Sequence, residues 1–368
     1  MATFDGVGVF SRRLLRTSVI AAAAVFAALA VTGCGSDRGE QAAASDPDAL
    51  RAGIQYMRPG RIRVALVSPS SGSHEYNALS IKGLQDAIVK LRVRGTFVES
   101  RSASAYSADL SNLARMGYDL IITVGSRMAS ATHLVAQRYP DTMFAIVDHA
   151  YSSGRALPNV EGLVFDEAQA GYLVGYVSGM MSRTSVMATI AGDGAAARRF
   201  VLGFRAGAKA TKRKLRILSA SVPADAAQET CRRIALGQIE RGADVVFPVA
   251  DSCSSGALEA AGARRVWGVG VDTDQSYLGP HILASAVKNV DVAVLDAIRG
   301  VANGAVEDAV GTMAPYAFHG GGVTVYGAQY RAIGLGRVSP AVSPRLLARI
   351  DVIKRRMTGG SVVIVDGR

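Results

Sequence analysis

Ile62-Arg63-Val64-Ala65-Leu66-Val67 is a short apolar run that leads into Ser68-Pro69-Ser70-Ser71-Gly72-Ser73 and then into a helical pattern over residues 76–91. The same order of apolar run, polar loop and helix returns at residues 120–139. Continuous apolar runs of this length, separated by helices, are typical of parallel strands in a sheet that helices cover on both faces. This stretch therefore predicts an α/β fold with a doubly wound parallel sheet.

The pattern continues as two consecutive sets of strands, at residues 62–164 and 186–271, which predicts two lobes facing a cleft. Ligands of open parallel sheets bind beyond the carboxyl ends of the strands. Small or polar residues follow six of the predicted strands, so we expect a polar cleft there: 68–73, Gly125-Ser126, Asp148, Gly192-Asp193-Gly194, Ala250-Asp251-Ser252 and Asp272-Thr273-Asp274.

The N-terminal segment reads as an export signal. Arg12, Arg13 and Arg16 precede an apolar run of 13 residues, 19–31, which is shorter than the roughly 20 residues of a membrane-spanning helix. Val31-Thr32-Gly33-Cys34 resembles a bacterial lipobox, which implies cleavage after residue 33 and lipidation of Cys34. An ordinary secretory signal is the alternative, and the Sec and Tat export routes both remain open. Residues 34–60 are polar and predict a flexible tether.

The chain has 368 residues and a formal net charge of +11. A basic surface attracts nucleic acid, anionic lipid or an acidic ligand. The predicted export and the lack of an aromatic-basic recognition motif indicate that the basic surface faces an anionic membrane or cell wall rather than nucleic acid. With Cys34 assigned to lipid, Cys231 and Cys253 remain as one expected disulfide, with two separate buried thiols as the alternative. The five histidines show no metal-ligand spacing, so we expect neither metal nor cofactor.

Several motifs, in order along residues 62–328, resemble those of a known protein family. The most specific is 268–275, Gly-Val-Gly-Val-Asp-Thr-Asp-Gln, followed by 285–288, Ser-Ala-Val-Lys. The others are Tyr76-Asn77 with Gly83, 117–122 with Val124-Gly125, 139–148, 170–175, 203–208 and 242–247. Together they resemble the basic membrane protein family of lipoproteins, which are solute-binding proteins of nucleoside importers.

The resemblance implies a type I periplasmic-binding fold, with two lobes joined by three crossovers. We expect residues 61–165 plus 281–305 in lobe I, residues 166–280 plus 306–335 in lobe II, and a helix and strand in 336–368. It also implies an extracytoplasmic, lipid-anchored protein at the cell membrane that works as a monomer with an ABC permease.

The resemblance also implies residue roles in binding a nucleoside. Asp272 and Lys288 would bind the ribose hydroxyls, since a carboxylate accepts and an ammonium donates hydrogen bonds. Tyr76 would stack on the base, as would Phe200 unless it only packs a helix. Asn77 would pair with the base or ribose, and Ser73 and Gly125 would line the site. Asp272 and Lys288 as a structural ion pair is the alternative.

This sequence departs from the family at Gly72-Ser73-His74-Glu75, where the family carries Asp-Asp-x-Ser before its aromatic residue and Asn. The missing Asp is the expected acceptor for purine N–H groups, so a sugar or another polar ligand stays possible. The chain lacks Gly-x-Ser-x-Gly and Gly-x-Gly-x-x-Gly, so we expect no catalytic residues and no enzyme. A lipoprotein that senses a ligand for a membrane partner is the alternative function.

Overall fold

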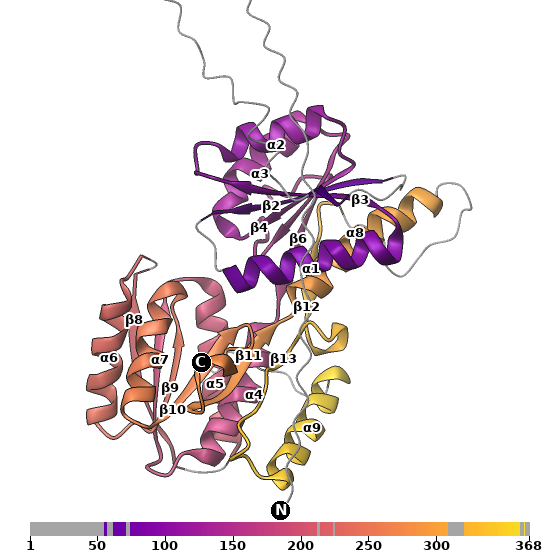
Figure 1. Ribbon diagram of the computed structural model, residues 1–368. Coiled ribbons are helices and arrows are strands. Elements are labelled where there is room, and N and C mark those ends of the chain that lie inside the picture. Colours follow the sequence, from indigo (N-terminus) through magenta and orange to yellow (C-terminus); the bar gives the residue numbers. More distant parts are fainter. Residues whose placement is uncertain are drawn as a thin grey trace, which may run out of the picture. The chain divides into compact units, whose positions relative to one another are not determined.

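The computed structural model describes residues 55–56, 62–70, 74–211, 214–223, 225–307, 320–360 and 364. These residues form two sheets within one compact unit, Ser45–Arg368 (Figure 1). The predicted α/β class with two parallel-dominated sheets is confirmed. The expected signal segment 1–33, Cys34 and Ser73 lie outside the described residues.

The first sheet contains β1 (Gln55–Tyr56), β2 (Arg63–Pro69), β3 (Arg94–Ser100), β4 (Leu120–Val124), β5 (Met143–Val147), β6 (Val160–Phe165) and β12 (Val323–Tyr326). Its order is β1-β3-β2-β4-β5-β6-β12, and all neighbours are parallel except β1 and β3. Because β1 pairs with β3, the end of the expected tether carries a short strand that its polar composition did not indicate.

The second sheet contains β7 (Val186–Gly192), β8 (Arg216–Val222), β9 (Val245–Val249), β10 (Trp267–Asp272), β11 (Ile282–Lys288) and β13 (Ile333–Leu335). Its order is β13-β11-β10-β9-β7-β8, and only β11 and β13 are antiparallel. Strands β4 and β9 are buried along their whole length, as expected of parallel strands covered on both faces.

Helices cover both faces of each sheet. The first sheet packs against α1 (His74–Leu91) and α8 (Val290–Glu307) on one face and α2 (Tyr106–Arg115) and α3 (Ala129–Arg138) on the other. The second packs against α4 (Glu167–Met181) and α5 (Ala195–Ala210), and on its other face against α6 (Gln228–Glu240) and α7 (Ser254–Ala263). The C-terminal helix α9 (Pro344–Thr358) packs on α4, and the strand expected after it falls outside the described residues.

Short 3-10 turns follow four of these strands, at η2 (Ser126–Met128), η3 (Asp251–Cys253), η4 (Ser276–Leu278) and η5 (Ala328–Tyr330). Among the described residues, no helix combines the length and the apolarity that crossing a membrane requires.

The chain passes between the two sheets three times, from β6 to α4, from β11 to α8 and from β12 to β13. Hydrogen bonds join these passages: Asp166 N–H donates to Tyr326 O at 3.0 Å, and Asn289 N–H donates to Ala332 O at 2.7 Å. Strand β11 thus belongs to the second sheet and β12 to the first, whereas we expected residues 281–305 in the first lobe and 306–335 in the second. A buried strand has the same apolar pattern in either sheet, so the sequence does not indicate to which sheet the strand belongs.

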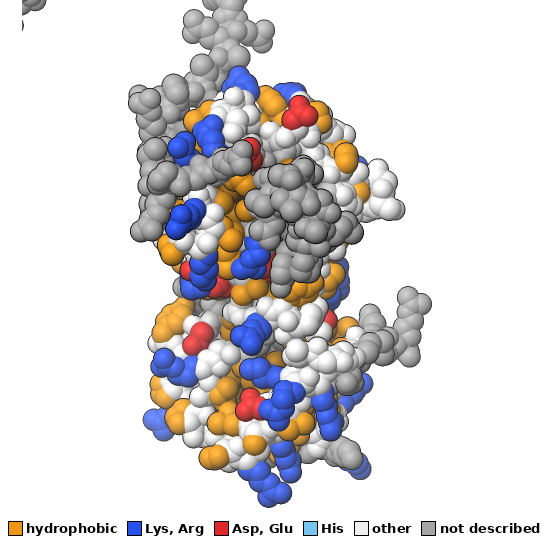
Figure 2. All heavy atoms as spheres, turned by 90° about the vertical axis from the view of Figure 1, so that its right-hand side faces the viewer, with side chains coloured by type: hydrophobic (Ala, Val, Ile, Leu, Met, Phe, Trp, Pro, Cys, Tyr) orange, Lys and Arg blue, Asp and Glu red, His pale blue; other side chains and the backbone are white. Residues whose placement is uncertain are grey.

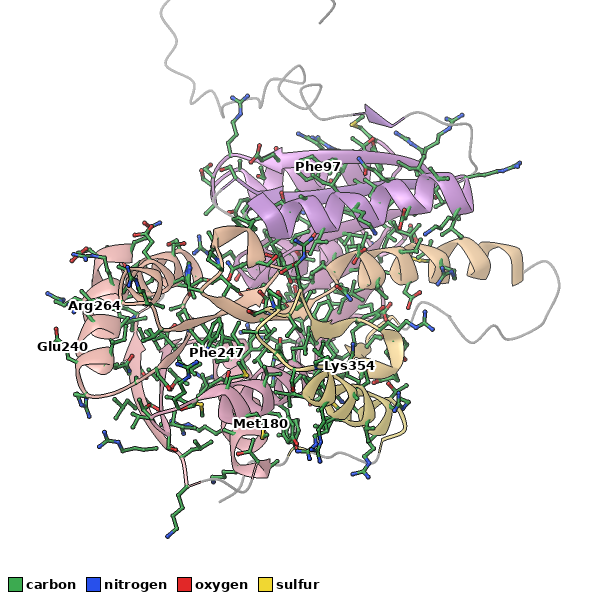
Figure 3. All side chains as sticks on the ribbon, turned by 60° about the horizontal axis from the view of Figure 1, so that its bottom comes forward. Phe97, Met180, Glu240, Phe247, Arg264 and Lys354 are labelled. Carbon is green, nitrogen blue, oxygen red and sulfur yellow. A yellow bond between two sulfur atoms is a disulfide. The ribbon has the colours of Figure 1, made fainter. Side chains whose placement is uncertain are left out.

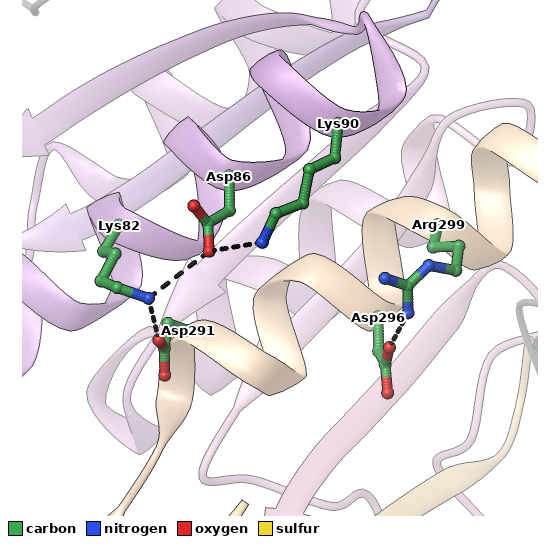
Figure 4. Close-up of polar contacts among 6 residues, drawn as sticks. All are labelled: Lys82, Asp86, Lys90, Asp291, Asp296 and Arg299. Atoms are coloured by element: carbon green, nitrogen blue, oxygen red, sulfur yellow. Dashed lines mark hydrogen bonds and ion pairs between the residues drawn. The ribbon is translucent and has the colours of Figure 1, made fainter.

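Helix α8 is attached to α1 through charge and close packing (Figure 4). Lys82 pairs with Asp291 and with Asp86, and Lys90 also pairs with Asp86 at 3.1 Å. A Cβ at Gly83 would lie 2.6 Å from Asp291 O, so only glycine allows the two helices this approach. These contacts fix the segment after β11 to the first sheet.

Helices α4 and α5 are in direct backbone contact through glycines spaced four residues apart. A Cβ at Gly171 would lie 2.2 Å from Phe200 O, and one at Gly203 would lie 1.9 Å from Ala168 O. Both distances are far below van der Waals contact, so each site requires glycine. The Phe204 ring of α5 stacks on Phe247 with ring centres 4.9 Å apart, and Figure 3 shows Phe247 in the core of the second sheet. This packing sets the positions of the residues at the start of α4 and of α5.

Candidate ligand-binding site

Lys288, the last residue of β11, is the centre of a cluster of charged side chains. Its Nζ lies 3.0 Å from both carboxylate oxygens of Asp148, which directly follows β5. The Lys288 side chain is only 3% exposed. Because β5 belongs to the first sheet and β11 to the second, this ion pair joins the carboxyl ends of strands from both sheets.

Two further carboxylates approach the same ammonium group. Asp272, at the end of β10, has its Oδ1 at 3.4 Å from Lys288 Nζ, and Glu167, at the start of α4, has its Oε1 at 3.9 Å. Burial disfavours a charged lysine, but Asp148, Tyr76 and the other carboxylates outweigh burial and raise the pKa of Lys288 well above its usual value. Lys288 therefore stays protonated at any physiological pH.

Asp272 is held less tightly by Lys288 than Asp148 is. Its Oδ1 is buried and has only the longer ion pair with Lys288, at 3.4 Å, although the side chain as a whole is 39% exposed. Burial raises the pKa of Asp272, Lys288 lowers it in part, and the negative charge of Asp148 adds to the increase. A carboxylate in this position gains from any ligand that donates a hydrogen bond to it.

Tyr76 lies in the first turn of α1, and its hydroxyl donates a hydrogen bond to Asp148 Oδ2. Lys288 Nζ lies 5.3 Å from the centre of the ring. Burial, followed by the neighbouring Asp148 charge, raises the pKa of Tyr76 well above its usual value. We call Tyr76, Asp148, Glu167, Asp272 and Lys288 the Lys288 cluster.

Arg199 supports this cluster from α5. Its Nε donates to Glu167 Oε2 at 2.6 Å, and Glu167 is 1% exposed. The hydrogen bond from Arg199 therefore holds a buried carboxylate that also faces Lys288. The close backbone contact of α4 and α5 brings these two side chains together.

Phe200 lies in the core, where it is 1% exposed and packs edge-to-face with Phe247 at 6.4 Å. Its ring centre is 5.9 Å from Lys288 Nζ, so it forms an apolar wall behind the ammonium group. Phe165, at the end of β6, lies at 5.4 Å on another side. The predicted stacking of Phe200 on a ligand would require this buried ring to become accessible.

The remaining predicted residues lie near the ends of β4 and α1. Asn77 is half-buried beside Tyr76. Gly125 has φ +91°, and no atom lies within 4 Å of where its Cβ would be, so open space adjoins the backbone at the end of β4. The structure thus brings Tyr76, Asp272 and Lys288 together.

Sequence reasoning did not assign Asp148, Glu167 or Arg199 to the site. In the sequence Asp148 is only one of several polar residues that follow a strand, and its φ of +62° is a backbone feature that the sequence does not reveal. Glu167 follows the N-cap residue Asp166, where an acidic residue is explained by the helix dipole alone. Nothing in the sequence distinguishes it from an ordinary first-turn acid.

Away from this cluster, a disulfide joins Cys231 on α6 to Cys253, with Cα atoms 5.5 Å apart. Glu240 and Arg264, near the ends of α6 and α7, also face each other (Figure 3). Within the described ranges, no group of three or more His, Cys, Asp or Glu residues is arranged to hold a metal ion.

Comparisons with known proteins agree with this architecture. The CD4+ T-cell-stimulating antigen of Listeria innocua is 27% identical over 95% of this chain and 99% of that protein. The ABC transporter nucleoside-binding protein BmpA of Lactococcus lactis is 27% identical over 81% of this chain and 88% of that protein. A solved solute-binding protein of an ABC transporter system from Aeropyrum pernix has the same fold, with a TM-score of 0.64, 21% identity, and coverage of 83% of this chain and 94% of that one.

The family model described as "ABC transporter substrate-binding protein PnrA-like" matches residues 63–353, which is most of the sequence and includes every member of the Lys288 cluster. The chain therefore belongs to this family of ABC transporter substrate-binding proteins.

Proposed function

We propose that this substrate-binding protein takes up a nucleoside at the Lys288 cluster and delivers it to an ABC permease. The observation that carries the proposal is the convergence of Lys288, Asp148 and Asp272 from strand ends of both sheets. The name of the Lactococcus lactis relative, a nucleoside-binding protein, supports the ligand class.

The ribose is the part of the ligand that the cluster suits best. Two vicinal hydroxyls can each donate and accept a hydrogen bond, so they match a carboxylate beside an ammonium group. The Asp272 Oδ1 has only a 3.4 Å contact with Lys288, so a ligand hydroxyl could donate a shorter hydrogen bond to this carboxylate. Hydrogen bonds to a charged group contribute about 1.5–3 kcal/mol each.

Ligand entry would rearrange the contacts of Lys288. The ammonium already interacts with Asp148 and Asp272, so a ribose hydroxyl would take over part of that coordination rather than add to it. The Tyr76 ring, with Lys288 Nζ 5.3 Å from its centre, would offer a face for the base. Asn77, Ser73 and Gly125 would then contact the edge of the base or the ribose.

The test is calorimetric titration of the full chain with purine and pyrimidine nucleosides, and in parallel with free bases, ribose and hexoses. Asp272→Asn keeps the shape of the side chain and removes its charge, so nucleoside affinity should fall by about 10- to 100-fold, which corresponds to the lost charged hydrogen bond. Asp86→Asn changes a partly exposed carboxylate on α1 that is not a member of the Lys288 cluster, so it is the matched control and should leave affinity unchanged.

Tyr76 variants separate stacking from hydrogen bonding. Tyr76→Phe retains the ring and should weaken nucleoside binding less than Tyr76→Ala. Binding of a free sugar with the same dependence on Asp272 would overturn the nucleoside assignment and keep the site. Nucleoside binding that Asp272→Asn leaves unchanged would overturn the site.

We also propose that Cys34 carries the lipid that holds the protein on the extracytoplasmic face of the membrane. The support is the sequence Val31-Thr32-Gly33-Cys34 at the end of the apolar run. Cys34→Ala should leave an unprocessed precursor that does not incorporate labelled fatty acid. Normal processing of this variant would contradict the anchor.

A further inference from the structure

One face of helix α9 is buried against helix α4, which covers the second sheet. Leu346, Ile350 and Met357 are buried and pack with Leu173 and Val177 of α4. Ser343 caps the helix by accepting a hydrogen bond from Leu346 N–H. The helix is thus rigidly attached, and its other faces have a fixed direction.

One outward flank of α9 carries a stripe of arginines. Arg345, Arg349 and Arg356 are all exposed, and their spacing of four and seven residues places them on one side of the helix. Val352, 38% exposed, falls between them on the same flank. Asp351, the acidic residue of the helix, lies on the opposite flank. Basic side chains gather on this part of the surface (Figure 2).

The helix dipole accounts for Arg356, which lies in the last turn, but not for Arg345. The dipole at a helix start favours acidic residues, yet the first turn of α9 has none and carries Arg345 directly after Pro344. In the described part of the chain, none of the three arginines forms an ion pair or side-chain hydrogen bond. Their charge is therefore not neutralised by the described part of the chain and is available to an anionic partner.

We propose that the Arg345–Arg349–Arg356 flank of α9 docks on an anionic phospholipid surface. Guanidinium groups bind phosphate in a bidentate manner, and a basic helical flank with an interspersed apolar residue suits the headgroup region. Over residues 345–356 the stripe extends about 17 Å, at ~1.5 Å per residue, enough to contact several headgroups. This surface is separate from the Lys288 cluster, and the proposal does not depend on the ligand.

An environment-sensitive fluorophore at position 352 tests the proposal in the full chain. Val352→Cys is introduced with Cys34→Ser, so that NBD labels the flank while Cys231 and Cys253 remain bonded. The labelled chain is mixed with vesicles of phosphatidylcholine alone or with about one third phosphatidylglycerol. We expect a blue shift of NBD emission only with phosphatidylglycerol, and its loss as salt is raised, because exposed charges are screened at roughly 3 Å in 1 M salt.

Matched triple variants assign the effect to the stripe. Arg345→Gln, Arg349→Gln and Arg356→Gln together should abolish the shift, since each basic residue near an anionic surface strengthens binding about fivefold. Arg94→Gln, Arg101→Gln and Arg138→Gln, three exposed arginines of the first sheet's layer, change the net charge equally and should retain it. Circular dichroism melting confirms that both triple variants are folded.

Three results would overturn the proposal. An equal shift with phosphatidylcholine would make the contact apolar rather than electrostatic. A shift that survives in the α9 triple variant would place docking elsewhere. A shift that requires native membranes and is absent with pure phosphatidylglycerol vesicles would identify a membrane protein as the partner.

Discussion

The protein has two clusters of lysine and carboxylates that differ in almost everything but composition. The exposed cluster joins Lys82, Asp86 and Lys90 of α1 to Asp291 at the start of α8 (Figure 4). Its Lys82 side chain is 54% exposed, whereas Lys288 in the buried cluster is 3% exposed. Water already stabilises the two lysines of the first cluster, but protein groups must stabilise the lysine of the second.

This difference is the reason why we propose the buried cluster, and not the exposed one, as the ligand site. An exposed ion pair is worth about 0–1 kcal/mol and is screened by salt. A buried pair is weak evidence for stability, because desolvation offsets the attraction, and removing one partner leaves an uncompensated charge. Buried charged side chains of this kind suit the binding of a polar ligand, because the ligand can displace water from them and form hydrogen bonds with them.

The largest expected effect comes from removing the central lysine. Lys288→Met should lower the free energy of unfolding by about 3 kcal/mol, because Glu167 and Asp148 lose their shared cation in a buried setting. Lys90→Met, the matched change in the exposed cluster, should lower it by less than about 1 kcal/mol, because Asp86 is partly exposed and keeps Lys82. Urea denaturation of the two variants without ligand measures both values. Equal losses would show that burial does not separate the clusters.

The second prediction concerns the glycine contact that holds the buried cluster together. Gly203→Ala places a Cβ against Ala168 O and should destabilise the protein by about 2 kcal/mol through overpacking. It should also weaken ligand binding, since α4 and α5 carry Glu167 and Arg199. Gly237→Ala in α6, where no atom lies within 4 Å of the added Cβ, should be neutral or stabilising by up to about 1 kcal/mol. Thermal melts and calorimetry on both variants provide the comparison.

The sequence predicted most of the fold because the relevant signals are local. Buried parallel strands such as β4 and β9 are apolar throughout, and polar residues mark their ends. The family predicted from the motifs is confirmed by the match over residues 63–353. Membership in a family of substrate-binding proteins also supports the expectation that the chain binds its ligand without transforming it.

The site was harder to predict because its contacts join distant parts of the chain. Asp148 and Lys288 are 140 residues apart, and no periodicity relates them. The cluster members that the sequence predicts as ligand contacts, Tyr76, Asp272 and Lys288, all lie in the motifs that resemble the family. The sheet to which β11 belongs could not be predicted either, because an apolar strand fits equally well beside β10 or beside β6.

The smallest expected effect distinguishes the buried cluster by its response to alkaline pH. The pKa of Tyr76 is raised well above 10.0, chiefly by burial and then by Asp148, so above pH ~10 the unfolded chain loses a proton that the folded chain keeps. The stabilisation is therefore complete below the unfolded pKa and is lost as pH rises, by at most about 1.4 kcal/mol per pH unit for one group. Lys288, whose pKa is also raised, acts in the same direction.

Tyr76→Phe should reduce the slope of unfolding free energy against pH by up to that amount above pH ~10. Tyr151→Phe is the comparison, because burial raises the pKa of Tyr151 only to about 12, and its influence on the slope should end near that pH. Urea titrations at a series of alkaline pH values measure the slopes, and a wild-type slope in Tyr76→Phe would show that its hydroxyl titrates as freely in the folded chain as in the unfolded one.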